Sequence, residues 1–267
     1  MIPKIIHYCW FGRNPLPASA KKCIASWRKY LPDYEIWQWS EEPLHDNVND
    51  NENVLFDKIL SFDVNSIPYT KQAYEAKKYA FVSDYARFWI LYHKGGLYFD
   101  TDVEIVAPLE EIVAHGPFMG IEKNAWQDGK PMVNPGLGLG VEAGHPFYGN
   151  MLQLYRKLFF INPMGKENTT TVVEYTTKEL YSKGMKPMEE IQKVYDIWIY
   201  PADYFCPMDS TTGIITLSEC TVSIHHYDCS WMNHNTLSFK LHQVKNLVFR
   251  LIGPQMATNI NKILCRS

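Results

Sequence analysis

The sequence predicts an α/β protein with a mostly parallel central sheet flanked by helices. The chain opens with an apolar strand at residues 2–8, a helix at residues 19–30 and a second strand at residues 34–39, and this β-α-β order is typical of parallel sheets. Of the 267 residues, 46% are hydrophobic, which suffices for one sizeable core. We assign residues 1–235 to this domain and residues 236–267 to a separate C-terminal tail.

The first strand is followed by a loop that begins at Trp10. Ligands of parallel sheets bind outside the carboxyl ends of the strands, so Trp10 is placed to stack on a flat ligand group. A core or lid tryptophan is the alternative interpretation. Ser19 is expected to cap the first helix.

The next part of the chain leads into a central helix. Residues 41–53 are polar and read as a solvated connection, and residues 54–80 read as helical segments broken near Pro68. The following helix is apolar nearly all round, which indicates burial, and it ends at Gly95. Asp84 and Arg87 share one face of it. Because buried charges must be paired or bound, they form either a structural ion pair or part of a ligand site.

A short strand at residues 97–99 comes next and ends at Asp100 and Asp102. Two carboxylates in an i, i+2 arrangement beside a turn can reach one hard divalent cation and its waters. This carboxylate pair is the predicted chemical centre of the protein.

The second half of the sequence alternates shorter elements. We expect strands at residues 103–106, 118–121, 137–141, 194–200 and 221–226, and helices at residues 145–159 and 170–182. The last strand carries His225 and His226, which point to opposite faces, so only one of them is expected to face a site. That imidazole could complete a metal shell begun by Asp102, or the histidines could be structural.

Composition restricts the partners and the compartment. A net charge of −3 gives no global signal for nucleic acid binding. Six scattered cysteines without Cys-x-x-Cys spacing, no signal peptide and no long apolar segment predict a cytoplasmic protein. After Asp228 every charged residue is basic, and an apolar stripe follows residues 239–252. The tail is therefore either a peripheral contact with the anionic inner face of a membrane or a packing helix.

Taken together, residues 2–12, 83–87, 95–102 and 225–231 resemble the DXD-containing sugar-transferase family, in the same order along the chain. This family includes bacterial capsular and lipopolysaccharide glycosyltransferases and the yeast initiating mannosyltransferase, and its core is similar to the glucosylating clostridial toxins. The resemblance implies a GT-A type nucleotide-sugar-binding fold, a Mn²⁺ or Mg²⁺ ion, and transfer of a hexose with retention. The acceptor would be a glycan or a lipid-linked molecule in surface polysaccharide synthesis, and a UDP-sugar is the favoured donor.

The resemblance also assigns roles to residues. Trp10 would stack on the nucleotide base, and Asp84 with Arg87 would hold the donor sugar and its phosphate. Asp100 would contact the ribose or a metal-bound water, and Asp102 would bind the metal. The remaining implied contacts are a metal-binding histidine, His225 or His226, and the leaving diphosphate beside Ser230 and Trp231.

Two other functions fit parts of the pattern. An apolar strand followed by Asp-x-Asp is also the nucleophile motif of haloacid dehalogenase-type phosphatases, with Asp100 as nucleophile and Asp102 as acid. The downstream acidic pair of such enzymes is missing after Asp102. A non-catalytic carbohydrate-binding protein would keep the aromatic pocket, but the intact carboxylates and Arg87 argue against it.

Overall fold

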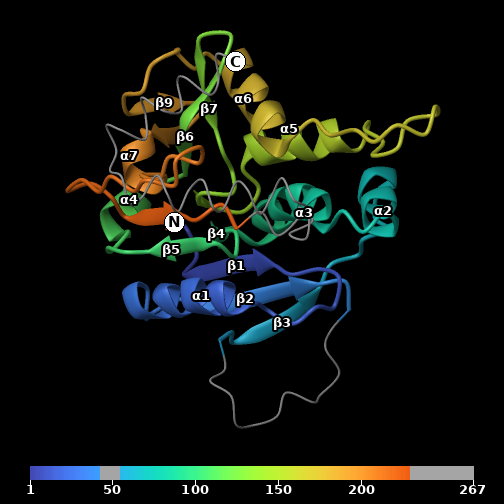
Figure 1. Cartoon of the computed structure of the whole chain (residues 1–267), viewed down its shortest axis with the longest axis horizontal. Helices are drawn as coiled ribbons and strands as arrows, with labels where there is room; N and C mark the ends of the chain where they lie inside the picture. The colour runs from blue at the N-terminus through green and yellow to red at the C-terminus, as the bar shows by residue number, and fades with distance from the viewer. Residues whose placement is uncertain (43–54, 229–267) are drawn as a thin grey trace.

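A nine-stranded sheet runs through the part of the chain that the computed structural model describes, residues 1–42 and 55–228. Its strand order is β3-β2-β1-β4-β8-β6-β10-β9, with β7 paired to β6 (Figure 1). In chain order the strands are β1 (Ile5–Cys9), β2 (Glu35–Ser40), β3 (Lys58–Ser61), β4 (Gly96–Tyr98), β6 (Phe118–Gln127), β7 (Lys130–Val133), β8 (Leu139–Val141), β9 (Gln192–Val194) and β10 (Ile197–Tyr200).

The direction of the strands changes along the sheet. The pairs β3–β2, β2–β1 and β1–β4 are parallel, as the β-α-β opening predicts. Beyond β4 the sheet is mixed, because β8 runs antiparallel to both β4 and β6 while β10 is parallel to β6. The α/β class with a central sheet flanked by helices is confirmed, and its parallel part lies in the N-terminal half.

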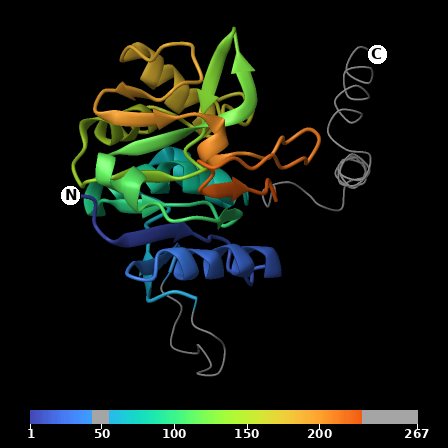
Figure 2. The ribbon, with the colours of Figure 1, turned by 90° about the vertical axis from the view of Figure 1, so that its left-hand side faces the viewer.

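Helices cover both faces of the sheet over two apolar clusters. The larger cluster takes side chains from α2 (Pro68–Glu75), α3 (Tyr79–Lys94), α5 (Pro146–Tyr155) and α6 (Val172–Ser182). The other takes side chains from α1 (Ala18–Tyr30), α4 (Glu110–His115) and α7 (Ala202–Phe205). Figure 2 shows the β6–β7 hairpin, in green, extending beyond the rest of the sheet.

A second, two-stranded sheet lies beside the first. It pairs β5 (Val103–Ile105) with β11 (Ser223–His225) in antiparallel register, with His225 opposite Val103. This pairing brings the end of the described chain next to the carboxylate motif, more than a hundred residues earlier in the sequence.

Helix α3 ends as its sequence predicts. Gly95 is the C-cap residue with φ +65°, and its N–H donates to the carbonyl of Leu91. Gly96 follows with φ +103°, and a Cβ there would lie 2.7 Å from the carbonyl oxygen of Ile5. Glycine therefore permits both the turn and the close approach of β4 to β1.

Three local predictions are wrong. Residues 58–61 form the edge strand β3 instead of a helix, because they complete the free edge of β2 and Lys58 pairs with Glu35 at 2.9 Å. Helix α1 begins at Ala18 after Pro17, which makes no side-chain cap, so Ser19 is not the capping residue. The strand expected at residues 194–200 is a hairpin of β9 and β10, turned at Tyr195 and Asp196, whose φ values are 49° and 68°.

Among the described residues, no helix is both long enough and apolar enough to cross a membrane.

Trp27 joins α1 to the start of β5, directly after the carboxylate motif. Its side chain is fully buried, and its Nε1–H donates to the carbonyl of Val103 at 2.7 Å. We expect Trp27→Phe to lower the free energy of unfolding by about 1–3 kcal/mol, because it leaves a buried carbonyl without a donor. Urea denaturation checks this. The matched control is Trp37→Phe, whose indole N–H donates to exposed Glu35, and equal losses in both variants would contradict the role of the Trp27 hydrogen bond.

Candidate active site

The candidate site lies at the carboxyl end of the parallel strands, where α3 begins. Strand β4 runs parallel to β1 with Tyr98 opposite His7, so Asp100 follows the end of β4 at the edge where β1 also ends. Helix α3 precedes β4 and runs back along it, which places its first turns, with Asp84 and Arg87, at the same edge. Asp84, Arg87 and Asp100 therefore converge through the topology.

Arg87 bridges the helix and the strand. Its guanidinium donates to Asp84 Oδ1 at 3.1 Å and to Asp100 Oδ2 at 3.2 Å, and its Nε donates to the carbonyl of Ser83. The residue is only 3% exposed, and the guanidinium also lies 5.0 Å from the centre of the Tyr98 ring. The sequence pairs Asp84 with Arg87, and the structure adds Asp100 as the second partner.

One guanidinium shared by two carboxylates leaves one negative charge in excess. Burial raises the pKa of Asp84 to about 7, although Arg87 lowers it, and burial likewise raises the pKa of Asp100. Burial lowers the pKa of Arg87, but its carboxylate neighbours raise it further, so the guanidinium keeps its charge. A further cation would therefore stabilise the ionised form of both carboxylates.

Asp102 contacts the end of the described chain. Its Oδ1 lies 3.3 Å from His225 Nε2, and its Oδ2 accepts the backbone N–H of Asp228 at 3.0 Å. Burial opposes the charge on Asp102, but His225 and the Asp228 N–H together hold its pKa below the usual value. Burial opposes the imidazolium too, yet Asp102 raises the pKa of His225 to about 9.

The two neighbouring histidines have different partners. His226 Nε2 lies 2.8 Å from Glu104 Oε2, and Glu104 also pairs with Lys22 at 3.5 Å. Side chains alternate along the strand, so His225 faces Asp102 while His226 faces the other way. Of the two candidates from the sequence, the structure therefore places His225 at the carboxylate pair.

The contacts of Asp102 and His225 fit a divalent metal ion. The part of the chain that the structure describes contains no cluster of three His, Cys, Asp or Glu side chains close enough to hold one. However, the 3.3 Å between His225 Nε2 and Asp102 Oδ1 matches adjacent octahedral ligands, roughly 3 Å apart for bonds of 2.0–2.1 Å. The other ring nitrogen, Nδ1, is buried without a hydrogen-bond partner, so it could carry the proton when Nε2 is a ligand. Asp100 is held by Arg87 and Tyr98, so it suits contact through a water.

Residues that the sequence did not single out support both carboxylates. Glu122 accepts from Asn134 Nδ2 at 3.1 Å and from the Tyr227 hydroxyl at 3.0 Å. Asn134 Oδ1 accepts the N–H of Gly136, whose carbonyl accepts the N–H of Asp100. The Tyr227 ring packs edge-on against His225, with centroids 4.2 Å apart. Glu122 thus connects the turn between β7 and β8, which positions Asp100, to the aromatic ring that packs against His225.

Trp10 lies at the same edge of the sheet, after β1. It is half-buried, and its Nε1–H donates to the carbonyl of Asn14 at 2.6 Å. The loop is tied to its surroundings by Glu41, which accepts the N–H of Gly12 and the hydroxyl of Tyr74. The loop after β1 is therefore held in place with Trp10 beside the site.

Other predicted site residues lie outside the described residues. These are Ser230 and Trp231. The C-terminal tail at residues 236–267 and most of the polar connection at residues 41–53 also lie outside the described residues.

Residues 17–119 match the family described as "Glycosyltransferase sugar-binding region containing DXD motif". This segment contains Asp84, Arg87, Asp100 and Asp102, so it includes the motif and its buried arginine. The comparison therefore relates residues 17–119 to the glycosyltransferase region that contains the DXD motif.

Two proteins that are similar to part of this chain occur in fission yeast. The chain is 29% identical to inositol phosphoceramide mannosyltransferase 1 of Schizosaccharomyces pombe over 121 residues, which are 44% of this chain and 33% of that protein. It is 29% identical to inositol phosphoceramide mannosyltransferase 3 of the same organism over 168 residues, 59% of this chain and 37% of that protein. The match thus spans little more than a third of each relative. The solved structure of PaToxG glycosyltransferase is similar over 68% of this chain and 70% of that chain, with 20% identity and a TM-score of 0.47.

Gly136 lies where a side chain would displace Asp100. A Cβ at Gly136 would overlap the Asp100 carboxylate, and Asn134 Oδ1 would be 3.0 Å away. We expect Gly136→Ala to weaken Mn²⁺ binding on the order of tenfold and to lower the melting temperature, because the Asp100 carboxylate must turn away from its place and from buried Arg87. Calorimetric titration with Mn²⁺ measures this. Gly149→Ala is the control, since its new methyl group would meet only the Tyr92 ring at 3.2 Å; an equal effect there would contradict the local explanation.

Proposed function

We propose that residues 1–235 form a GT-A type, metal-dependent glycosyltransferase domain that moves a hexose from a nucleotide-sugar to a glycan or lipid-linked acceptor. The observation that carries this proposal is the convergence of Asp102, His225 and the Asp84–Arg87–Asp100 triad at the carboxyl edge of the sheet. Topologically, this edge is where ligands of α/β sheets bind.

The charges of the site support a divalent cation, and that cation together with Arg87 would suit a donor with a diphosphate. If a metal ion displaced the proton of His225 and all three carboxylates were ionised, Arg87 would leave two negative charges in excess, which one divalent cation would neutralise. Bound to these residues, Mn²⁺ or Mg²⁺ supplies a Lewis acid for the departing phosphate oxygens. Arg87 is buried and oriented by two carboxylates, so it presents a fixed positive charge without reorganisation.

Each residue of the site has its own role in this proposal. Asp102 and His225 would hold the metal, and Asp100 would orient a metal-bound water or the ribose. Asp84 and Arg87 would position the donor sugar and its phosphate, while Trp10 would stack on the base from the loop after β1. Ser230 and Trp231 would contact the leaving diphosphate.

The donor, the acceptor and the pathway belong to the proposal as well. The resemblance to capsular and lipopolysaccharide enzymes favours a UDP-sugar and surface polysaccharide synthesis, with retention at the anomeric carbon. The names of the fission yeast relatives favour mannose as the transferred hexose. A donor panel must therefore contain both UDP-sugars and GDP-mannose.

The site supports a transferase better than a phosphatase. In a haloacid dehalogenase-type reaction Asp102 would donate a proton as general acid. Here the pKa of Asp102 is held low despite burial, since His225 and the Asp228 N–H stabilise its charged form. Asp100, the nucleophile of that mechanism, is held by Arg87 and Tyr98.

We expect a matching nucleotide-sugar to raise the melting temperature of the chain only when Mn²⁺ is present, because a ligand that binds the native state stabilises it. Asp102→Ala should abolish this shift and turnover while leaving the ligand-free melting temperature nearly unchanged. A thermal-shift panel of UDP-, GDP- and CDP-sugars, with product detection, measures both. Unchanged turnover in Asp102→Ala would overturn the proposal, and phosphate release from an aryl phosphate would favour the phosphatase.

The two histidines provide a matched pair of variants. We expect His225→Ala to weaken Mn²⁺ binding by about tenfold to a hundredfold, because it removes the nitrogen that faces Asp102. Substitutions of residues around a bound metal typically have effects of about this size. His226→Ala should leave Mn²⁺ binding within about twofold, since that side chain contacts Glu104. Titration calorimetry distinguishes them, and the reverse order of effects would assign the metal to the other face of the strand.

A further inference from the structure

The segment between α5 and α6, residues 156–171, projects from the body of the molecule (Figure 1, yellow, at the right). An antiparallel bridge between Ile161 and Glu167 folds it into a hairpin. The hairpin ends in a tight turn in which the N–H of Gly165 donates to the carbonyl of Asn162 at 2.8 Å. Neither the carboxylate site nor the sheet requires this projection.

The hairpin is ordered, yet it exposes apolar side chains, Met164 at its tip and Phe159 beside its base. Asn162 Oδ1 accepts the N–H groups of Met164 and Lys166, both at 2.9 Å, which holds the turn in one conformation. Met164 is 89% exposed and Phe159 is 55% exposed. A folded turn that presents large apolar groups to water gains nothing from them unless another surface covers them.

The base of the hairpin is anchored close to the candidate site. Phe160 is buried against Phe81, with ring centroids 5.0 Å apart, and the N–H of Ile161 donates to Gln72 of α2 at 3.0 Å. Phe81 lies one turn before Asp84 in α3. The hairpin therefore stands at the end of the sheet where the carboxylates lie.

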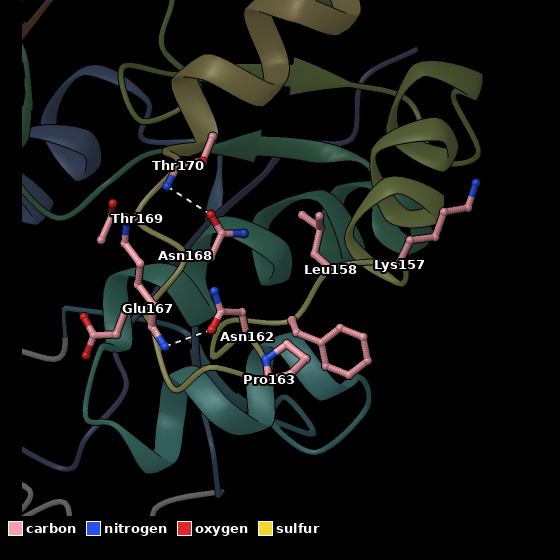
Figure 3. Close-up of a pocket in the computed structure, with 10 residues that line it drawn as sticks. Lys157, Leu158, Asn162, Pro163, Glu167, Asn168, Thr169 and Thr170 are labelled. Atoms are coloured by element: carbon pink, nitrogen blue, oxygen red, sulfur yellow. Dashed lines mark hydrogen bonds between the residues drawn. The ribbon is translucent and has the colours of Figure 1, made fainter.

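A cavity of about 460 Å³ lies between the two legs of the hairpin. Figure 3 shows Lys157 and Leu158 on one side of it, and Asn162, Asn168 and Thr170 on the other. Its polar side chains are engaged by the hairpin's own backbone, as in the hydrogen bond from the Thr170 N–H to Asn168 Oδ1 at 3.2 Å. Because the cavity separates the two legs, the hairpin presents a wide surface.

The charge around the hairpin is positive in a chain whose net charge is −3. Residues 156–171 contain three basic residues and one acidic residue, and the acidic Glu167 is paired with Lys78 at 3.4 Å. Helix α2 and the turn after it add three more basic residues and one acid. The basic residues of both segments are Lys71, Lys77, Lys78, Arg156, Lys157 and Lys166. An anionic surface would complement the positive charge of this end of the molecule, which carries an exposed apolar side chain at the tip of the hairpin.

We propose that the hairpin of residues 156–171 docks the protein on an anionic lipid surface, with Phe159 and Met164 entering the interface and the surrounding lysines contacting lipid headgroups. Apolar groups ringed by basic ones bind such surfaces by combining apolar burial with attraction to anionic headgroups. The contact involves residues distinct from the C-terminal tail. It places the carboxylate end of the sheet close to the membrane, where a lipid-linked molecule would present its headgroup.

Vesicle co-sedimentation of the full chain tests this proposal. We expect binding to vesicles of phosphatidylserine and phosphatidylcholine, weaker binding to phosphatidylcholine alone, and loss of most binding in 0.5 M NaCl. Phe159→Ser with Met164→Ser, and separately Lys157→Glu with Lys166→Glu, should each lower partitioning about tenfold or more. Residues 229–267 are present in every variant, so any contribution from them is common to all.

Matched controls separate the hairpin from general surface effects. Leu217→Ser removes an apolar side chain of 59% exposure elsewhere, and Lys186→Glu reverses an exposed charge elsewhere. Either control lowering partitioning as much as the hairpin variants would overturn the proposal. So would a dimer in solution that Phe159→Ser with Met164→Ser dissociates, because a second copy would then cover the tip. Metal-dependent donor binding should be unchanged in the hairpin variants, so failure here is distinguishable from failure of the transferase.

A depth measurement gives an independent check. A tryptophan at the tip, in Met164→Trp, should be quenched by lipids brominated on their acyl chains, because it enters the interface. Leu217→Trp should not be quenched. No difference in quenching between these variants would overturn the proposal even if both bind vesicles.

Discussion

The buried guanidinium of Arg87 is the constraint on which the site depends. It is the shared partner of a carboxylate on α3 and a carboxylate at the end of β4, so the position of the helix relative to the strand is set by charge as well as by packing. Removing charged groups from water is costly, and hydrophobic replacements of such clusters are often as stable or more so. The triad of Asp84, Arg87 and Asp100 has one carboxylate more than it has guanidinium groups. Its burial at the carboxyl end of the strands is therefore explained better by the proposed binding of a ligand than by a gain in stability.

The second half of the site depends on a different kind of contact. Strand β11 pairs with β5, and this short ladder brings His225 against Asp102 and the Asp228 N–H against the same carboxylate. Glu122 joins the two halves through Asn134 and Tyr227. The arrangement of Asp100, Asp102 and His225 is therefore a property of two sheets held together, and neither sheet contains it alone.

Local patterns in the sequence predict the central helix, its glycine end and the strand that leads to the carboxylates, because periodicity and capping depend on neighbouring residues. They also place Asp84 with Arg87 on one helix face and Asp100 with Asp102 at the end of a strand, while the resemblance to the sugar-transferase family implies that the four residues share a site. They do not find Glu122, Asn134 or Tyr227, because the roles of these residues arise from tertiary contacts: Tyr227 reaches Glu122 from more than a hundred residues away in the sequence, and Asn134 acts on Asp100 through Gly136. The choice between His225 and His226 likewise required the register of β11 on β5. Strand β3 was missed because a free sheet edge, invisible in local sequence, stabilises it.

The distance along the chain between Asp102 and His225 has a consequence for synthesis. The ribosome delivers Asp102 long before His225, and strand β5 can gain its partner β11 only after the intervening residues have emerged. Until then the nascent chain holds a carboxylate motif without its imidazole. The pairing of Asp102 with His225 is consequently acquired late, so a truncated translation product would hold the two carboxylates of the motif without the histidine that faces them.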